Sequence, residues 1–303
     1  MKKISLFLIF MYVIGICVGC IKNDNLKESK VLIKDMTGRE IEIDTPVKKV
    51  VALTASDCEI LCTLGKIDTL VGRGTYCDYP KEVKDIQSVQ SGENTNIEQI
   101  VLLKPDVILM STMAQSKDQI KSFEDVGIKV VVTDAKDIKG VYKSIKLIGS
   151  VVGRDKEALN VIADMKSKFD KIKEKSSNTN TAKKKIYFEV SPLEQGIWTA
   201  GNNTFMNEIV EMMGCENIFK DVDGWVNVSE EQIIERNPDY IVTISMYSGK
   251  GITPVDEIKS RKNWQSINAL KNNKILSADS NEISRPCPRI AHAAEILYEF
   301  VNN

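Results

Sequence analysis

Histidine is nearly absent from this sequence of 303 residues. His292 is the only one, whereas the common zinc sites use several histidines, and Ser–His or Cys–His nucleophiles need one beside the reacting group. The patterns GxxxxGK[ST], HExxH and GxSxG do not occur either. We therefore expect no enzyme, no resident cofactor and no metal site, and a receptor for free zinc or manganese ions is disfavoured. A surface enzyme that uses Asp or Glu as acid and base is the alternative.

An excess of positive charge is also lacking. Lys and Arg total 41 against 42 Asp and Glu, which gives a formal net charge of -1. Proteins that bind nucleic acid usually neutralise phosphates with a surplus of basic residues, so we expect no nucleic-acid partner. Apolar residues make up 43% of the chain, which is enough to fill hydrophobic cores, and the length corresponds to about two domains.

A disulfide framework is excluded by the cysteine pattern. Five cysteines follow Cys20, and they are Cys58, Cys62, Cys77, Cys215 and Cys287. An odd number of cysteines spread over a long chain does not form a disulfide scaffold. Cys58 and Cys62 are four residues apart, so a helix would bring their thiols near each other, but no second pair completes a zinc site. We expect the five to act as small buried apolar residues.

The amino terminus is a targeting segment. It reads MKKISLFLIFMYVIGICVGC, and its apolar run, too short to span a membrane as a helix, ends at Gly19 and Cys20. This resembles the lipobox of bacterial lipoproteins, which implies removal of signal peptide 1–19 and a diacylglyceryl group on Cys20. Two acyl chains anchor a protein stably. We therefore expect residues 20–31 to form a tether on the extracytoplasmic face of the membrane; an uncleaved anchor or a secreted protein are the alternatives.

The chain from Val47 onward alternates short β-branched runs with amphipathic stretches. This alternation predicts a parallel sheet covered by helices. The expected strands are 48–53, 106–111 and 128–134, and the expected helices lie near 57–64, 96–104, 115–126 and 139–152. Together these elements predict an N-terminal α/β lobe over residues 32–153.

The second half of the sequence repeats the plan of the first. Residues 96–109 (NIEQIVLLKPDVIL) align with residues 229–242 (SEEQIIERNPDYIV) and share six of fourteen positions. Two shorter matches precede and follow in the same order, EILCTLG with EIVEMMG and KVVVTD with KILSAD. Each match alone is weak, because such helix ends and turns before strands are common in α/β folds. Their shared order nevertheless predicts a second, related lobe over residues 179–303.

A single long helix is expected between the lobes, over residues 154–178. Its apolar positions are Ala158, Ile162, Met165, Phe169 and Ile172, which recur at helical spacing among charged residues. Asp155 is suited to cap its start. At about 1.5 Å per residue, the helix spans roughly the width of a small domain, so we expect it to hold the two lobes at a fixed separation.

Several segments resemble the bilobal substrate-binding lipoproteins of ABC importers for corrinoids, ferric siderophores and haem. They are residues 75–80 (TYCDYP), 96–106 (NIEQIVLLKPD), 214–221 (GCENIFKD), 225–233 (WVNVSEEQI) and 285–290 (RPCPRI). The resemblance implies two α/β lobes with mainly parallel central sheets joined by one long interdomain helix, the class III arrangement of periplasmic binding proteins. It also implies a monomer that delivers a small metal-chelate ligand to a permease dimer with its ATPase.

A ligand is expected in the crevice between the lobes, outside the carboxyl ends of the strands. The candidate contacts there are Tyr76, Ser111, Trp198, Trp225, Tyr247 and Arg285. Rigid aromatic side chains suit a large flat macrocycle, and the resemblance to corrinoid-binding members matches Tyr76, Trp198 and Trp225 to positions that line the cleft. We therefore expect a cobalamin-type corrinoid.

A ferric siderophore or haem is the alternative ligand. Gly92 and Ser111 stand where corrinoid-binding members carry tryptophans, and the guanidinium of Arg285 can pair with ligand carboxylates; a loop-anchoring role is the other interpretation of Arg285. We expect Arg289 to be structural and His292 to be a packed helix residue rather than a haem ligand.

Glu98 and Glu231 occupy equivalent places in the two halves. Asn96 and Ser229 are suitable N-cap residues, each followed three positions later by a glutamine, which puts both glutamates at the second helical position. A carboxylate there complements the helix dipole. The resemblance gives these glutamates a second role, in which one carboxylate per lobe docks on arginines of the two permease subunits.

Overall fold

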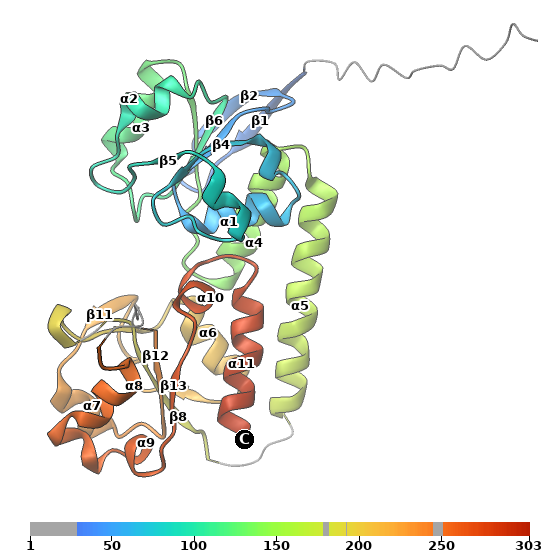
Figure 1. Ribbon diagram of the computed structural model, residues 1–303. Coiled ribbons are helices and arrows are strands. Elements are labelled where there is room, and N and C mark those ends of the chain that lie inside the picture. Colours follow the sequence, from blue (N-terminus) through green and yellow to red (C-terminus); the bar gives the residue numbers. More distant parts are fainter. Residues whose placement is uncertain (1–28, 178–181, 192, 245–250) are drawn as a thin grey trace, which may run out of the picture.

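The computed structural model describes residues 29–177, 182–191, 193–244 and 251–303. Figure 1 shows two α/β lobes, one above the other, with the long helix α5 running along one side of both. The predicted signal peptide, the predicted lipidation site Cys20 and the candidate contact Tyr247 lie outside the described residues. Within the described residues, no helix combines the length and apolar character needed to cross a membrane.

The N-terminal lobe contains a five-stranded parallel sheet in the order β5-β4-β3-β6-β7. Its strands are β3 (Val50–Ala52), β4 (Leu70–Gly74), β5 (Ser88–Val89), β6 (Val107–Met110) and β7 (Lys129–Val132). Its helices are α1 (Ala55–Thr63), η1 (Ile67–Thr69), η2 (Lys81–Asp85), α2 (Ile97–Leu102), α3 (Lys117–Asp125) and α4 (Ile138–Val151). All three strands and four helices predicted for this lobe are present; β4 and β5 were not predicted.

An antiparallel hairpin precedes this sheet, formed by β1 (Ser29–Lys34) and β2 (Glu40–Thr45). The prediction of a tether up to residue 31 is therefore wrong for its last three residues, which pair with β2. The physical reason is a strand with only one buried face: Ile33, Ile41 and Ile43 point inward and are buried, while polar neighbours face solvent and make the segment look like a linker.

Helix α5 (Asp155–Ser177) connects the lobes, as predicted. The five apolar positions expected to form its inner face are all buried. The helix packs against α4 of the first lobe and against α6 (Phe205–Met212) and α11 (Ile290–Asn302) of the second, and this contact with both lobes fixes their spacing. Asp155 is the first residue of the helix, and its carboxylate accepts a hydrogen bond from the Ser150 hydroxyl at 2.5 Å.

The C-terminal lobe contains a four-stranded parallel sheet in the order β10-β8-β12-β13, within the described residues. Its strands are β8 (Lys185–Glu189), β10 (Glu216–Asn217), β12 (Tyr240–Thr243) and β13 (Ile275–Ser277), and a separate antiparallel pair comprises β9 (Trp198–Ala200) and β11 (Trp225–Asn227). Its helices are η3 (Leu193–Gln195), α6 (Phe205–Met212), α7 (Glu230–Arg236), α8 (Pro254–Ser260), η4 (Lys262–Ser266), α9 (Asn268–Lys271), α10 (Ser280–Ser284) and α11 (Ile290–Asn302). The two sheets are separate, so the expected fold of two α/β lobes is confirmed.

Candidate functional site

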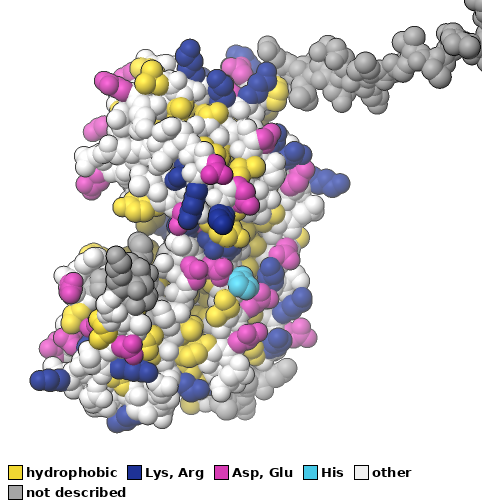
Figure 2. Space-filling model, viewed as in Figure 1, with side chains coloured by type: hydrophobic (Ala, Val, Ile, Leu, Met, Phe, Trp, Pro, Cys, Tyr) yellow, Lys and Arg dark blue, Asp and Glu magenta, His cyan; other side chains and the backbone are white. Residues whose placement is uncertain are grey.

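The surface is hollowed between the two lobes, on the side away from α5 (Figure 2). Loops that follow the strands of both sheets meet beside this hollow. The clearest contact joins Arg285, which lies beyond β13 and α10, to the backbone oxygen of Tyr76, which follows β4, at 3.1 Å. The carboxyl edges of the two parallel sheets therefore face each other, which is where α/β folds bind ligands.

The loop that carries Tyr76 leaves β4 through a glycine. A Cβ atom at Gly74 would lie 2.3 Å from the backbone oxygen of Leu53, so only glycine fits the close approach of β4 to β3. Beyond it the loop is held by a turn bond from the Cys77 amide to Gly74 and by a 3.0 Å bond from Arg73 to the Cys77 oxygen. The Tyr76 side chain remains 72% exposed and is free to contact a ligand.

Trp198 and Trp225 lie on paired strands of the opposite lobe. Trp225 pairs with Ala200 and Asn227 pairs with Trp198, so both tryptophans project from the same face of the β9–β11 ribbon as diagonal neighbours. Trp225 packs edge to face on Phe205 with ring centroids 6.0 Å apart, whereas Trp198 is 42% exposed. The β9–β11 ribbon lies at the edge of its lobe that borders the hollow (Figure 1).

Arg285 does not present a free guanidinium to a ligand. Its Nη1 donates to Glu59 Oε1 at 2.7 Å and to Asp78 Oδ1 at 2.8 Å, and its side chain is only 13% exposed. These contacts join the two lobes and agree with the loop-anchoring interpretation of Arg285, and its pairing with ligand carboxylates stays a prediction. Arg289 is structural, as predicted, because it donates two further bonds to Glu59 at 2.7 and 2.8 Å.

Ser111 is also engaged within the protein. It follows β6, is buried, and donates from its hydroxyl to Asp134 Oδ1 at 2.8 Å, while its amide donates to the side chain of Gln115. Asp134 accepts further bonds from the amide and hydroxyl of Thr112. Ser111 therefore stabilises the loop that follows β6. Its role as a ligand contact stays a prediction.

Glu98 and Glu231 occupy the second positions of α2 and α7, and both are exposed. Figure 1 shows these short helices on the same side of the molecule, one in each lobe. Asn96 and Ser229 cap them through hydrogen bonds at 3.0 and 3.3 Å. Hydrogen bonds from its own amide and from Ser229 lower the pKa of Glu231, so this carboxylate is ionised at neutral pH.

His292 lies on the surface, contrary to the prediction. It was expected to be packed, but its side chain is 56% exposed on α11, and its Nδ1 lies 2.9 Å from Glu282 Oε2. The helix turns its apolar neighbours inward and leaves position 292 on the outer face. No cluster of three metal-binding side chains occurs among the described residues.

The five cysteines of the described residues form no disulfide, and four of them are buried, as expected. Cys62 is only partly buried. The neighbouring Cys62 and Cys77 thiols, together with burial, raise the pKa of the Cys58 thiol above its ordinary value. Cys58 and Cys62 both lie on α1.

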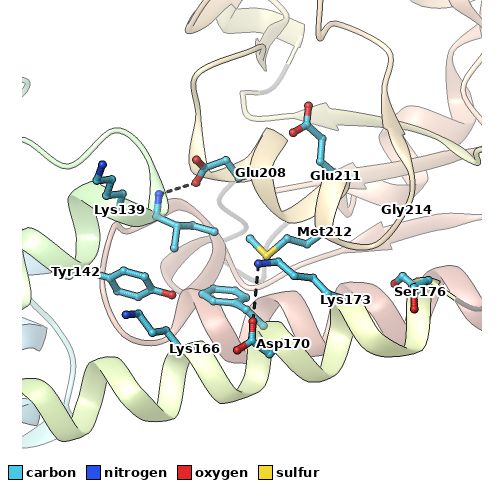
Figure 3. A pocket seen from close by; sticks show the side chains of 13 residues that line it. Lys139, Tyr142, Lys166, Asp170, Lys173, Ser176, Glu208, Glu211, Met212 and Gly214 are labelled. Carbon is cyan, nitrogen blue, oxygen red and sulfur yellow. Dashed lines mark hydrogen bonds and ion pairs between the residues drawn. The ribbon is translucent and has the colours of Figure 1, made fainter.

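A pocket of about 770 Å³ lies away from the hollow, between α4, α5 and α6 (Figure 3). Its charged side chains belong to three lysines and three acids, which are Lys139, Lys166, Lys173, Asp170, Glu208 and Glu211. Several are already engaged: Glu208 accepts a 2.7 Å bond from the Ile138 amide, and Lys166 lies 5.5 Å from the centre of the Tyr142 ring. The pocket lies between helices of both lobes, and no residue of β9 or β11 lines it.

Buried carboxylates near the strand ends were not anticipated from the sequence. Glu59 is 2% exposed on α1, Asp57 is buried on the same helix, and Glu189 ends β8 in a bidentate pair with Arg261 at 2.7 and 2.9 Å. Burial raises the pKa of Asp57 to about 6 against hydrogen bonds from Thr133 and Thr54. The sequence did contain a signal for these residues, namely acids inside an apolar helical run, as in SDCEILC. Such acids are buried only when they are paired, so the run indicates a paired carboxylate in the core.

Comparisons with known proteins agree with this architecture. A model of the periplasmic binding protein family matches residues 50–282. The chain is 34% identical to the uncharacterized ABC transporter substrate-binding lipoprotein YvrC of Bacillus subtilis, over 99% of this chain and 97% of that protein. It is 26% identical to a vitamin B12-binding protein of Pectobacterium carotovorum, over 82% of this chain and 86% of that protein.

A solved structure extends the likeness to three dimensions. The crystal structure of a possible iron-binding, periplasmic solute-binding protein from Staphylococcus epidermidis superposes with a TM-score of 0.73 at 34% identity, covering 86% of this chain and all of that one. Two lobes on one long helix with a hollow between them, together with these matches, define a substrate-binding protein of an ABC transporter. The chain belongs to the periplasmic binding protein family, whose members work with the permease and ATPase components of ABC importers.

Proposed function

We propose that this protein captures a cobalamin-type corrinoid in the hollow between its lobes and passes it to an ABC permease, without catalysing a reaction and without a resident cofactor. The observation that carries the proposal is the shared face of Trp198 and Trp225 at the edge of the hollow, opposite the lobe that bears exposed Tyr76. Aromatic rings offer a flat macrocycle large contact area at low entropic cost. The similarity to a vitamin B12-binding protein supports the same ligand class.

A ferric siderophore or haem is the second candidate ligand. The similarity to a possible iron-binding protein favours it. The pairing of Arg285 with Glu59 and Asp78 counts against one mode of binding, in which that guanidinium holds a ligand carboxylate. A carboxylate ligand would have to displace one of these partners and leave its charge partly buried, which is costly.

Ligand titration separates the two candidates. The purified protein is titrated with cyanocobalamin, with haemin and with a ferric hydroxamate siderophore, and binding is followed by tryptophan quenching and confirmed by equilibrium dialysis. Saturable one-to-one binding of cyanocobalamin supports the proposal, and saturable binding of haemin or the siderophore without the corrinoid moves the assignment to the second candidate. Binding of none of the three overturns both.

We also propose that the protein is held at the outer face of the membrane by lipid on Cys20. The apolar run that ends at Gly19 and Cys20 supports this, as does the similarity to a substrate-binding lipoprotein. The variant Cys20→Ser removes the acylated side chain, so it is expected to leave the membrane fraction. Retention of Cys20→Ser in that fraction after an alkaline wash would contradict lipid anchoring.

A further inference from the structure

Glu59 of the N-terminal lobe is bound almost entirely by the C-terminal lobe. Its Oε1 accepts from Arg285 Nη1 at 2.7 Å and Arg289 Nη2 at 2.8 Å, and its Oε2 accepts from Arg289 Nε at 2.7 Å and Cys287 Sγ at 3.1 Å. The carboxylate is 2% exposed, so these bonds are shielded from water. Charge-assisted and bidentate bonds of this kind are the strongest in proteins.

The same two arginines hold the loop that carries Tyr76. Arg285 donates to the Tyr76 backbone oxygen at 3.1 Å and to Asp78 at 2.8 Å, and the Arg289 guanidinium lies 3.8 Å from the centre of the Tyr79 ring. The loop of the N-terminal lobe is thus attached to the C-terminal lobe at three points. Glu59 lies behind both arginines and fixes the direction of their guanidinium groups.

We infer that Glu59 is a positioning residue for ligand binding: through Arg285 and Arg289 it sets the place of the Tyr76 loop from the opposite lobe without touching the ligand. The Tyr76 side chain is 72% exposed and is not among the side chains that pack on the hydrophobic cores of its lobe. Its direction therefore depends on its backbone, and the backbone is held by Arg285. This inference rests on the proposed function for the ligand, but its structural part can be tested without any ligand.

The ligand-free test is hydrogen–deuterium exchange of the amides of residues 75–79. In Glu59→Gln the arginines lose their charged acceptor, so these amides are expected to exchange about tenfold faster than in the wild type, because local opening becomes easier. Asp35→Asn is the matched control. It removes a buried carboxylate that accepts from Arg39 at 2.7 Å in the same lobe, and it is expected to leave exchange at residues 75–79 unchanged.

The ligand-dependent test is a double-mutant cycle with Tyr76→Ala. If cyanocobalamin is the ligand, Tyr76→Ala weakens binding about tenfold in the wild type and much less in Glu59→Gln, because coupled residues are not additive. In Asp35→Asn the loss should equal that in the wild type. A purely structural Glu59 would leave the Tyr76→Ala loss the same in all three backgrounds and overturn the inference, as would unchanged exchange in a folded Glu59→Gln.

Two further outcomes are distinguishable. A wild type that binds no corrinoid contradicts the proposed function, while the exchange experiment still decides the role of Glu59. Should Glu59→Gln fail to fold, Arg285→Lys takes its place, because a lysine keeps the charge but does not reach Glu59, Asp78 and Tyr76 at once. Arg285→Lys is expected to accelerate exchange at residues 75–79, and unchanged exchange in that variant overturns the inference.

Discussion

Asp106 and Asp239 occupy the same place in the two lobes. Each follows a proline and precedes a buried strand, and the Oδ2 of each accepts hydrogen bonds from backbone amides at the start of the neighbouring central strand. Asp106 binds the amides of Lys48 and Lys49 at 2.8 and 2.9 Å, and Asp239 binds that of Lys185 at 3.0 Å. The repeated Pro-Asp pair thus aligns β6 with β3 and β12 with β8.

Removal of either carboxylate leaves strand amides without a protein acceptor. We expect Asp106→Ala and Asp239→Ala each to lower the free energy of unfolding by about 1 kcal/mol, the usual net value of such hydrogen bonds at a partly exposed site. Urea denaturation followed by circular dichroism measures the change. Asp44→Ala, on the exposed side of β2, is the control, and a loss as large as in the two other variants would contradict the proposed role.

The two tryptophans offer a direct test of where the ligand binds. Trp198→Ala and Trp225→Ala are each expected to weaken cyanocobalamin binding roughly tenfold, because each removes a large aromatic contact. Tyr142→Ala is the matched control, since this ring lines the pocket between α4, α5 and α6 instead. Isothermal titration calorimetry gives the dissociation constants. A loss confined to Tyr142→Ala would place the ligand in that pocket and contradict the tryptophan site.

Glu98 and Glu231 are predicted to act after ligand binding. Glu98→Ala and Glu231→Ala should each weaken binding to the permease about fivefold, with a larger loss in the double variant and a smaller difference at high salt, because exposed charge pairs are modest and screened. Binding of the ligand itself should not change.

Binding to permease in nanodiscs, measured by surface plasmon resonance, tests this prediction for the two glutamates. Glu235→Ala is the control, because Glu235 is an exposed acid later on α7. Equal losses in Glu235→Ala and Glu231→Ala would show that net charge, rather than the paired positions, governs docking.

Local signals predicted most of the fold. The 3.6-residue spacing of apolar positions gave α5 within one residue at each end, and the shared order of three motifs gave the second lobe. The β1–β2 hairpin was not predicted, because its outer face is mostly polar and its first strand resembles a linker. The helix that carries His292 was evident from the sequence, but the side of that helix that faces the core was not. His292 is exposed, whereas its neighbours Ala291 and Ala293 are buried.

The contacts of the site were less predictable because they are not local. Arg285 and Glu59 are 226 residues apart in sequence, so no spacing rule connects them, and an arginine in a cleft loop has the same appearance whether it meets a ligand or a partner lobe. The resemblance predicted the tryptophans as cleft residues, and that role stays a prediction. Their diagonal placement on one face of the ribbon required the register of β9 with β11.

Buried Asp57 gives the folded protein a defined pH dependence. Burial raises its pKa from 3.8 to about 6, although Thr133 and Thr54 donate to it at 2.5 and 2.6 Å. Between these two values the folded state holds a proton that the unfolded state releases, so stability falls as pH rises from about 4 to about 6 and stays lower above that range.

The variant Asp57→Asn does not titrate at this position. The free energy of unfolding of the wild type, relative to that of Asp57→Asn, should therefore fall by up to about 3 kcal/mol across this interval. Urea titrations at pH 4, 5, 6 and 7 measure it, with exposed Asp118→Asn as the control. A difference that does not change with pH would show that folding does not raise the pKa of Asp57.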